Sequence, residues 1–63
     1  MIIEVFSKGR TIGFVVAKDN LSASAKIADA FPNVDKVNVS YSLPKHDPRC
    51  KEIAPNIYAW VME

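Results

Sequence analysis

The chain is poor in cysteine, histidine and glycine, with one, one and two of these residues among 63. Cys50 alone cannot form an intrachain disulfide, and together with His46 it offers too few ligands for a structural zinc site. Neither Gly9 nor Gly13 opens a helix, so the sequence predicts no phosphate-binding glycine loop. We therefore expect no metal or other cofactor, and a fold stabilised by packing, alone or with a partner.

Long apolar runs and a large net charge are also absent. No stretch approaches the roughly 18 consecutive apolar residues that a membrane-spanning helix requires. The apolar run over residues 1–6 is interrupted by Glu4 and lacks the basic-then-apolar layout of a secretory signal. The formal net charge is +1, so no strong field attracts the chain to phosphate backbones. We expect a cytoplasmic protein with no membrane contact.

The overall composition is that of a folded domain. Hydrophobic residues make up 49% and charged residues 24% of the sequence, which is ordinary globular usage and unlike that of disordered chains. A length of 63 residues leaves room for one core. We predict a single small globular domain over residues 1–63.

The first part of the chain predicts a β-hairpin. Residues 1–7 and 11–17 are rich in β-branched and aromatic side chains, which favour strands. Gly9 lies between them and supplies the positive φ of a tight turn.

A helix is predicted next, over residues 21–31. Asn20 or Ser22 can cap its beginning, and Pro32 ends it. Its spacing of apolar residues gives a narrow stripe on one side. The stripe consists of Ala23, Ile27, Ala30 and Phe31.

The remaining chain predicts two strands joined by a loop. Residues 36–43 alternate apolar and polar side chains, which is typical of a strand that buries one face and exposes the other. Residues 44–56 contain three prolines and several basic residues, and we expect a long loop there. Residues 57–62 form a run that is apolar on both faces, so they predict a last strand.

The predicted fold class is α+β, with element order ββαββ and one helix packed on one face of a four-stranded antiparallel sheet. A right-handed crossover through the helix favours the spatial order 2-1-3-4, which leaves the last strand at an edge. The order 4-2-1-3 and a swapped dimeric arrangement remain open.

The strands carry more apolar surface than one helix can cover. Ile3, Val5 and Val15, with one side of the last strand, lack an evident cover. Contiguous apolar surface often marks an interface, and an apolar edge strand invites pairing with another chain. The alternative is that the loop 44–56 folds back, with Ile53 and its prolines, over the second face.

We therefore expect a small non-enzymatic protein-binding module. It would be a regulator, inhibitor or adaptor of the phage or mobile-element type, binding a larger protein or a second copy of itself as a homodimer. Its contact surface would be the open sheet face, the edge strand 57–62 and the loop 44–56, with aromatic anchors and basic residues that set orientation. The predicted protein-binding residues are Tyr58, Trp60, Met62, Lys45, His46, Arg49 and Lys51.

The alternative function is nucleic-acid binding through the basic loop 44–56 and the hairpin tip 8–10. Aromatic side chains on a sheet, next to basic residues, can stack single-stranded bases. No segment, however, has the glycine-aromatic-basic signature of an RNA-recognition strand. The residues predicted for this alternative are Lys8, Arg10, Lys45, Arg49 and Lys51.

Enzymatic activity is not predicted. His46, Asp47 and Cys50 are types that can activate a thiolate, but they lie within five positions of one loop, with no evident oxyanion-stabilising turn. We infer no catalytic, cofactor-binding or metal-binding residue and no small-molecule substrate.

Overall fold

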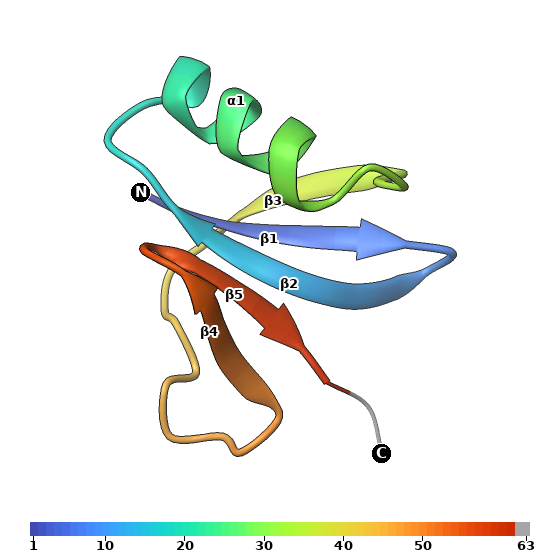
Figure 1. Ribbon diagram of the computed structural model, residues 1–63, viewed down its shortest axis with the longest axis vertical. Helices are drawn as coiled ribbons and strands as arrows, with labels where there is room; N and C mark the ends of the chain where they lie inside the picture. Colours follow the sequence, from blue (N-terminus) through green and yellow to red (C-terminus); the bar gives the residue numbers. More distant parts are fainter. Residues whose placement is uncertain (62–63) are drawn as a thin grey trace.

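The computed structural model describes residues 1–61, which form one antiparallel sheet and one helix (Figure 1). The elements are β1 (Ile2–Ser7), β2 (Arg10–Val16), α1 (Asn20–Ala30), β3 (Lys36–Ser40), β4 (Cys50–Ala54) and β5 (Ile57–Trp60). The strand order is β3-β1-β2-β5-β4, and α1 lies over one face of the sheet. The expected α+β class, with one helix and an antiparallel sheet, is confirmed. Within the described residues, no helix has the length and apolar character needed to cross a membrane.

The sheet contains a strand that the sequence did not predict. The segment 44–56, expected to be a loop, includes β4, which pairs antiparallel with β5. Pro55 and Asn56 form the turn between these two strands, and Asn56 has a left-handed φ of 64°. Proline followed by a residue with positive φ is the sequence preference of a type II turn.

The favoured strand order 2-1-3-4 is wrong, because the last strand pairs with β2 and not with β3. The order 4-2-1-3 has the observed neighbours, to which β4 is added outside β5. The run 57–62, expected at an edge, begins as the internal strand β5. The two edges of the sheet are β3 and β4.

The β1–β2 hairpin turns at Lys8 and Gly9. Both residues have positive φ, 53° and 73°, as a two-residue type I′ turn requires. The backbone N–H of Lys8 donates a hydrogen bond to the Asp35 carboxylate, which ties the hairpin tip to the segment before β3. Next to the turn, the β1–β2 register skips Ile12, whose side chain packs against the core.

Helix α1 begins one residue earlier than the sequence predicted. Its N-cap is Asp19, not Asn20 or Ser22, because the Asp19 carboxylate accepts a hydrogen bond of 2.8 Å from the Ser22 N–H. That hydrogen bond favours the charged form and lowers the pKa of Asp19. The helix ends at Ala30, directly before Phe31 and Pro32.

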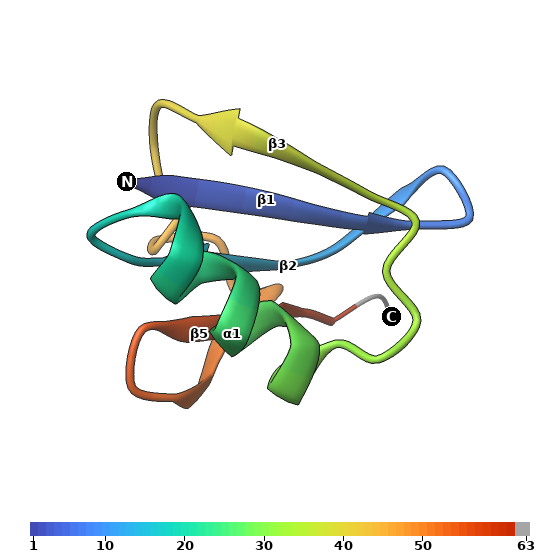
Figure 2. The ribbon, with the colours of Figure 1, turned by 90° about the horizontal axis from the view of Figure 1, so that it is seen from above.

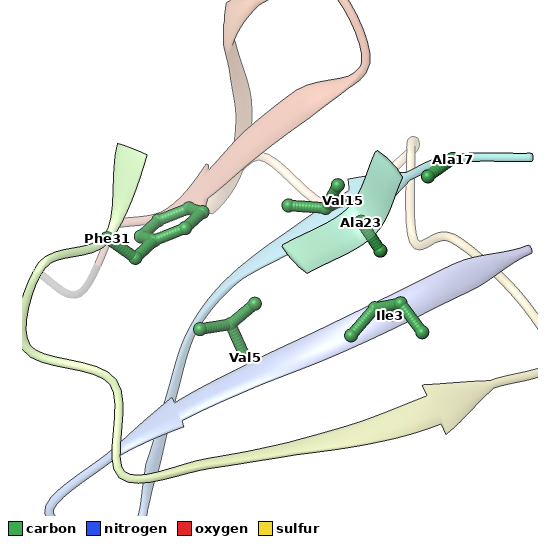
Figure 3. Close-up of a cluster of buried hydrophobic side chains, with 6 residues drawn as sticks. All are labelled: Ile3, Val5, Val15, Ala17, Ala23 and Phe31. Carbon is green, nitrogen blue, oxygen red and sulfur yellow. The ribbon is translucent and has the colours of Figure 1, made fainter. Parts of the chain in front are cut away.

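The core lies between α1 and the sheet (Figure 3). Val5 and Val15 are completely buried there, and Ile3 is buried beside them. The expectation that these three side chains lack a cover is therefore wrong, because α1 covers the face on which they lie. The predicted stripe of α1 does face the sheet: Ala23 and Phe31 are buried, and Ile27 and Ala30 pack against the same cluster.

The face of the sheet opposite α1 carries a smaller apolar contact, which is between two aromatic rings. Phe14, only 5% exposed, meets the ring of Trp60 edge-on, with ring centroids 5.9 Å apart. The β4–β5 hairpin bends away from α1 on this side of the sheet (Figure 1). Ile53 does not help to cover this face, since it is 56% exposed.

Candidate functional site

An exposed apolar surface lies along β3. Val37 and Val39 are 45% and 56% exposed, and Tyr41, directly after the strand, is 98% exposed. We call these three side chains, with the outer backbone edge of Lys36–Ser40, the β3 surface. The sequence predicted that this strand buries its apolar face, and that prediction is wrong.

The position of α1 explains why the valines are exposed. Val37 pairs with Val5 and Val39 pairs with Ile3, so both valines lie on the side of the sheet that α1 covers. The helix, however, packs on β2 and does not extend over β3 (Figure 2). The β3 surface is therefore a continuation of the core beyond the edge of the helix.

A second feature is built around Trp60, on the face of the sheet opposite α1. The Arg49 guanidinium lies 4.7 Å from the centroid of the Trp60 ring, which is cation–π distance. Arg49 also forms an ion pair of 2.8 Å with Asp47. The hydrogen bonds from Arg49 lower the pKa of Asp47 to about 2. Trp60 is thus held between Phe14 and a cation that is itself fixed by a carboxylate.

Cys50 follows this ion pair in the chain. Burial, and secondly the negative charge of Asp47, raise the pKa of its thiol. A nucleophilic cysteine needs the opposite shift, since the thiolate is the reactive form. Among residues 1–61, no group of three His, Cys, Asp or Glu side chains lies close enough to hold a metal ion.

A hollow of about 890 Å³ lies beside the hairpin tip. It brings together the tip, the segment before β3 and the end of β5. Two basic residues, Lys8 and Arg10, line it together with Asp35 and Trp60. Its lining residues are Ser7, Lys8, Arg10, Thr11, Ile12, Asn33, Val34, Asp35 and Trp60.

The side chains predicted for protein binding do not form one surface. Trp60 and Arg49 are in contact, but Lys51 pairs with Ala59 and so lies on the other side of the sheet from Trp60. Lys45 and His46 are exposed in the segment before β4. Tyr58 is half-buried within β5, and Met62 lies outside the described residues.

For the nucleic-acid alternative, Lys8 and Arg10 do share the hollow with Trp60. The Arg49 guanidinium lies over the Trp60 ring. Lys51 lies on the opposite side of the sheet. The predicted basic set is thus brought together only in part.

Sequence reasoning missed Val37, Val39 and Tyr41 as surface residues. The alternation of residues 36–43 shows which side chains share a face, but the exposure of that face depends on where the helix crosses the sheet. For this reason, no local sequence pattern could indicate that these side chains are exposed.

Comparison with family models, with curated proteins and with solved structures found no match to this chain.

Proposed function

We propose that this protein is a small non-enzymatic binding module that contacts a protein partner through the β3 surface. The observation that carries the proposal is the exposure of Val37, Val39 and Tyr41 along one free edge of the sheet. A regulator, inhibitor or adaptor acts through contacts of this kind, without chemistry of its own.

An edge strand provides two kinds of contact at once. The outer N–H and C=O groups of β3 can pair with an added strand, and the side chains next to that edge can give specificity. Val37 and Val39 offer apolar area that α1 leaves uncovered. Tyr41 adds a large aromatic side chain with a polar hydroxyl, a combination that is enriched at protein interfaces.

The test compares two substitutions at equally exposed positions on the two edge strands. Val39→Lys places a charge on the β3 surface, whereas Ile53→Lys places one on β4; both original side chains are 56% exposed. Wild type and variants would be immobilised and exposed to a lysate of the source organism, and each captured protein would then be purified and titrated. We expect Val39→Lys to weaken binding at least tenfold and Ile53→Lys to leave it unchanged.

Circular dichroism and thermal melting of both variants establish that each is folded. Loss of binding by both variants to the same degree would show that β3 has no special role. Equal binding by wild type and Val39→Lys would contradict the proposal directly.

Nucleic-acid binding is a second candidate, favoured by one observation. The hollow at the hairpin tip is lined by two cationic residues, Lys8 and Arg10, and by the aromatic residue Trp60. Cations track a phosphate backbone, and an aromatic side chain stacks on an unpaired base. Asp35, which also lines the hollow, opposes this use, although its carboxylate already accepts a hydrogen bond from the Lys8 backbone.

A matched pair of charge reversals tests this candidate. Arg10→Glu alters the hollow, and Lys51→Glu makes the same charge change on the other side of the sheet. Binding of labelled single-stranded DNA and RNA would be measured at about 50 mM salt, where phosphate contacts are strongest. If the hollow binds nucleic acid, Arg10→Glu should lose this binding and Lys51→Glu should keep it. Equal loss for both variants, or no binding by the wild type, would eliminate it.

A further inference from the structure

Of the two edge strands, β3 is the one suited to accept another strand. It pairs with β1 in continuous register from Lys36 to Ser40, and it has no proline and one charge. β4 has Lys51 and Glu52 in mid-strand, a register break beside Ile53 and a proline near each end. Charges, bulges and prolines are the usual protection of edge strands against pairing. β4 is therefore protected and β3 is open.

The sequence of β3 fits an antiparallel copy of itself. It reads Lys-Val-Asn-Val-Ser and is nearly symmetric about Asn38. In a pair centred on Asn38, Val37 lies opposite Val39 of the second copy, and Lys36 lies opposite Ser40 of that copy. All four valines share one face of the joined sheet and form cross-strand pairs. The two Lys36 charges lie at opposite ends of the pair.

Other registers fit less well. A pair centred on Val37 sets the charge of Asp35 opposite Val39, which leaves a carboxylate against an apolar side chain. A pair centred on Val39 needs residues 41–42 in extended form, but the chain bends after Ser40, whose hydroxyl donates a hydrogen bond of 2.9 Å to the carbonyl of Ser42. The register centred on Asn38 uses the whole strand and nothing beyond it.

We propose that β3 pairs antiparallel with β3 of a second copy of this chain, in the register centred on Asn38. The proposal rests on the proposed function, because it names the partner of the same β3 surface. Joining two five-stranded sheets in this way gives a ten-stranded sheet with both helices on the same face. The formal net charge of +1 per chain leaves little repulsion between the copies.

The dimer is expected to be weak. A strand of five residues per copy is much smaller than the 20–30 residues per partner of a standard interface. We therefore expect a dissociation constant of about 100 µM, with main-chain hydrogen bonds and valine pairs as its source.

Cysteine cross-linking tests both the pairing and its register. In a Cys50→Ser background, Asn38→Cys sets two thiols directly across the two-fold axis, where opposed Cα atoms lie about 5 Å apart and a disulfide can form. The control is Lys36→Cys, also on an exposed side chain of β3. Its two copies lie about 13 Å apart along the strands, which is too far for a disulfide. Oxidation should cross-link two copies of Asn38→Cys at least tenfold faster than two copies of Lys36→Cys.

The mass of the chain without added cysteines is measured in parallel by sedimentation, up to about 1 mM. We expect it to rise above the 7.0 kDa of the monomer and to return to that value in Val39→Lys. Equal cross-linking at positions 36 and 38, or a monomer at every concentration, would overturn the second copy as partner. If the chain proves to be a monomer but Val39→Lys still weakens the binding of a captured protein, the proposed function stands and only the dimer is excluded. If Val39→Lys binds that protein as well as wild type does, both the dimer and the proposed function fail.

Discussion

At the scale of single residues, the contact between Phe31 and Gly13 determines how closely the end of α1 approaches the sheet. The Phe31 ring occupies the space where a side chain at position 13 would begin. A Cβ built on Gly13 would lie 2.4 Å from the ring carbon Cζ and equally close to the Tyr58 carbonyl oxygen. Glycine is required here by space, and its backbone conformation is not the reason, since of the two glycines only Gly9 has positive φ.

Gly13→Ala is accordingly expected to destabilise the fold strongly. The added methyl group must displace an aromatic ring and a backbone carbonyl, and overpacking of this kind costs about 3 kcal/mol. Gly9→Ala is the control: it meets no atom within 4 Å and incurs only the strain of positive φ, about 1 kcal/mol. Urea unfolding measures both free energies. Equal effects would show that the Phe31 contact relaxes at little cost.

The Asp47–Arg49 pair gives a pH-dependent prediction. The pKa of Asp47 is lowered to about 2, first by the side-chain hydrogen bond from Arg49. A lowered folded-state pKa contributes stability above the ordinary value of 3.8, and that stability is lost as the pH falls towards 2. Arg49→Met should raise the pKa of Asp47 towards its ordinary value and reduce this dependence. NMR titration of the Asp47 carboxyl measures the shift. Lys45→Met, which removes a nearby exposed cation, should leave the pKa unchanged.

At the scale of elements, local patterns predicted the first half of the chain well. The β1–β2 hairpin, the single helix and a strand beginning at Lys36 all follow from residue types and their spacing. The last strand was predicted, but β4 and its pairing with β5 were missed, because Lys51 and Glu52 occupy the middle of β4 and prolines flank it. The strand character of β4 comes from its pairing with β5, which is a tertiary interaction and leaves little trace in the local sequence.

The cap of α1 is testable at this scale. Asp19→Ala removes the acceptor of the Ser22 N–H and should lower the melting temperature by about 5 °C. Asp19→Asn keeps an oxygen acceptor and should stay close to wild type at neutral pH. Thermal melts followed by circular dichroism measure both. A normal melting temperature for Asp19→Ala would assign the cap to another residue.

At the scale of the whole molecule, one helix covers only part of a five-stranded sheet. Which strands it leaves open follows from the strand order and from the crossing of α1, and neither is encoded in a short segment. This is why the pattern of residues 36–43 gave the face of Val37 and Val39 correctly but not their exposure. The sequence predicted uncovered apolar surface at Ile3, Val5 and Val15, which are buried, and did not predict the exposed apolar side chains of β3.

The same arrangement predicts that truncating two different valines changes the stability of the fold by very different amounts. Val5 is completely buried in the core, and Val5→Ala should lower the free energy of unfolding by about 2 kcal/mol. Val39→Ala, at the uncovered edge, should change the unfolding free energy by less than about 0.5 kcal/mol. Denaturant unfolding at low protein concentration makes the comparison on the monomer. Equal costs would place Val39 inside the cooperative core.

The site of Trp60 has a practical consequence for work on this chain. It is the only tryptophan in the sequence, and it lies against Phe14 and beneath Arg49 on the face opposite α1, with β1 and β2 between its strand and β3. Its fluorescence should therefore report unfolding and remain nearly silent when a strand joins the far edge. Tryptophan fluorescence can then report the unfolding of the chain even while β3 is occupied, and binding at β3 is followed by a separate measurement.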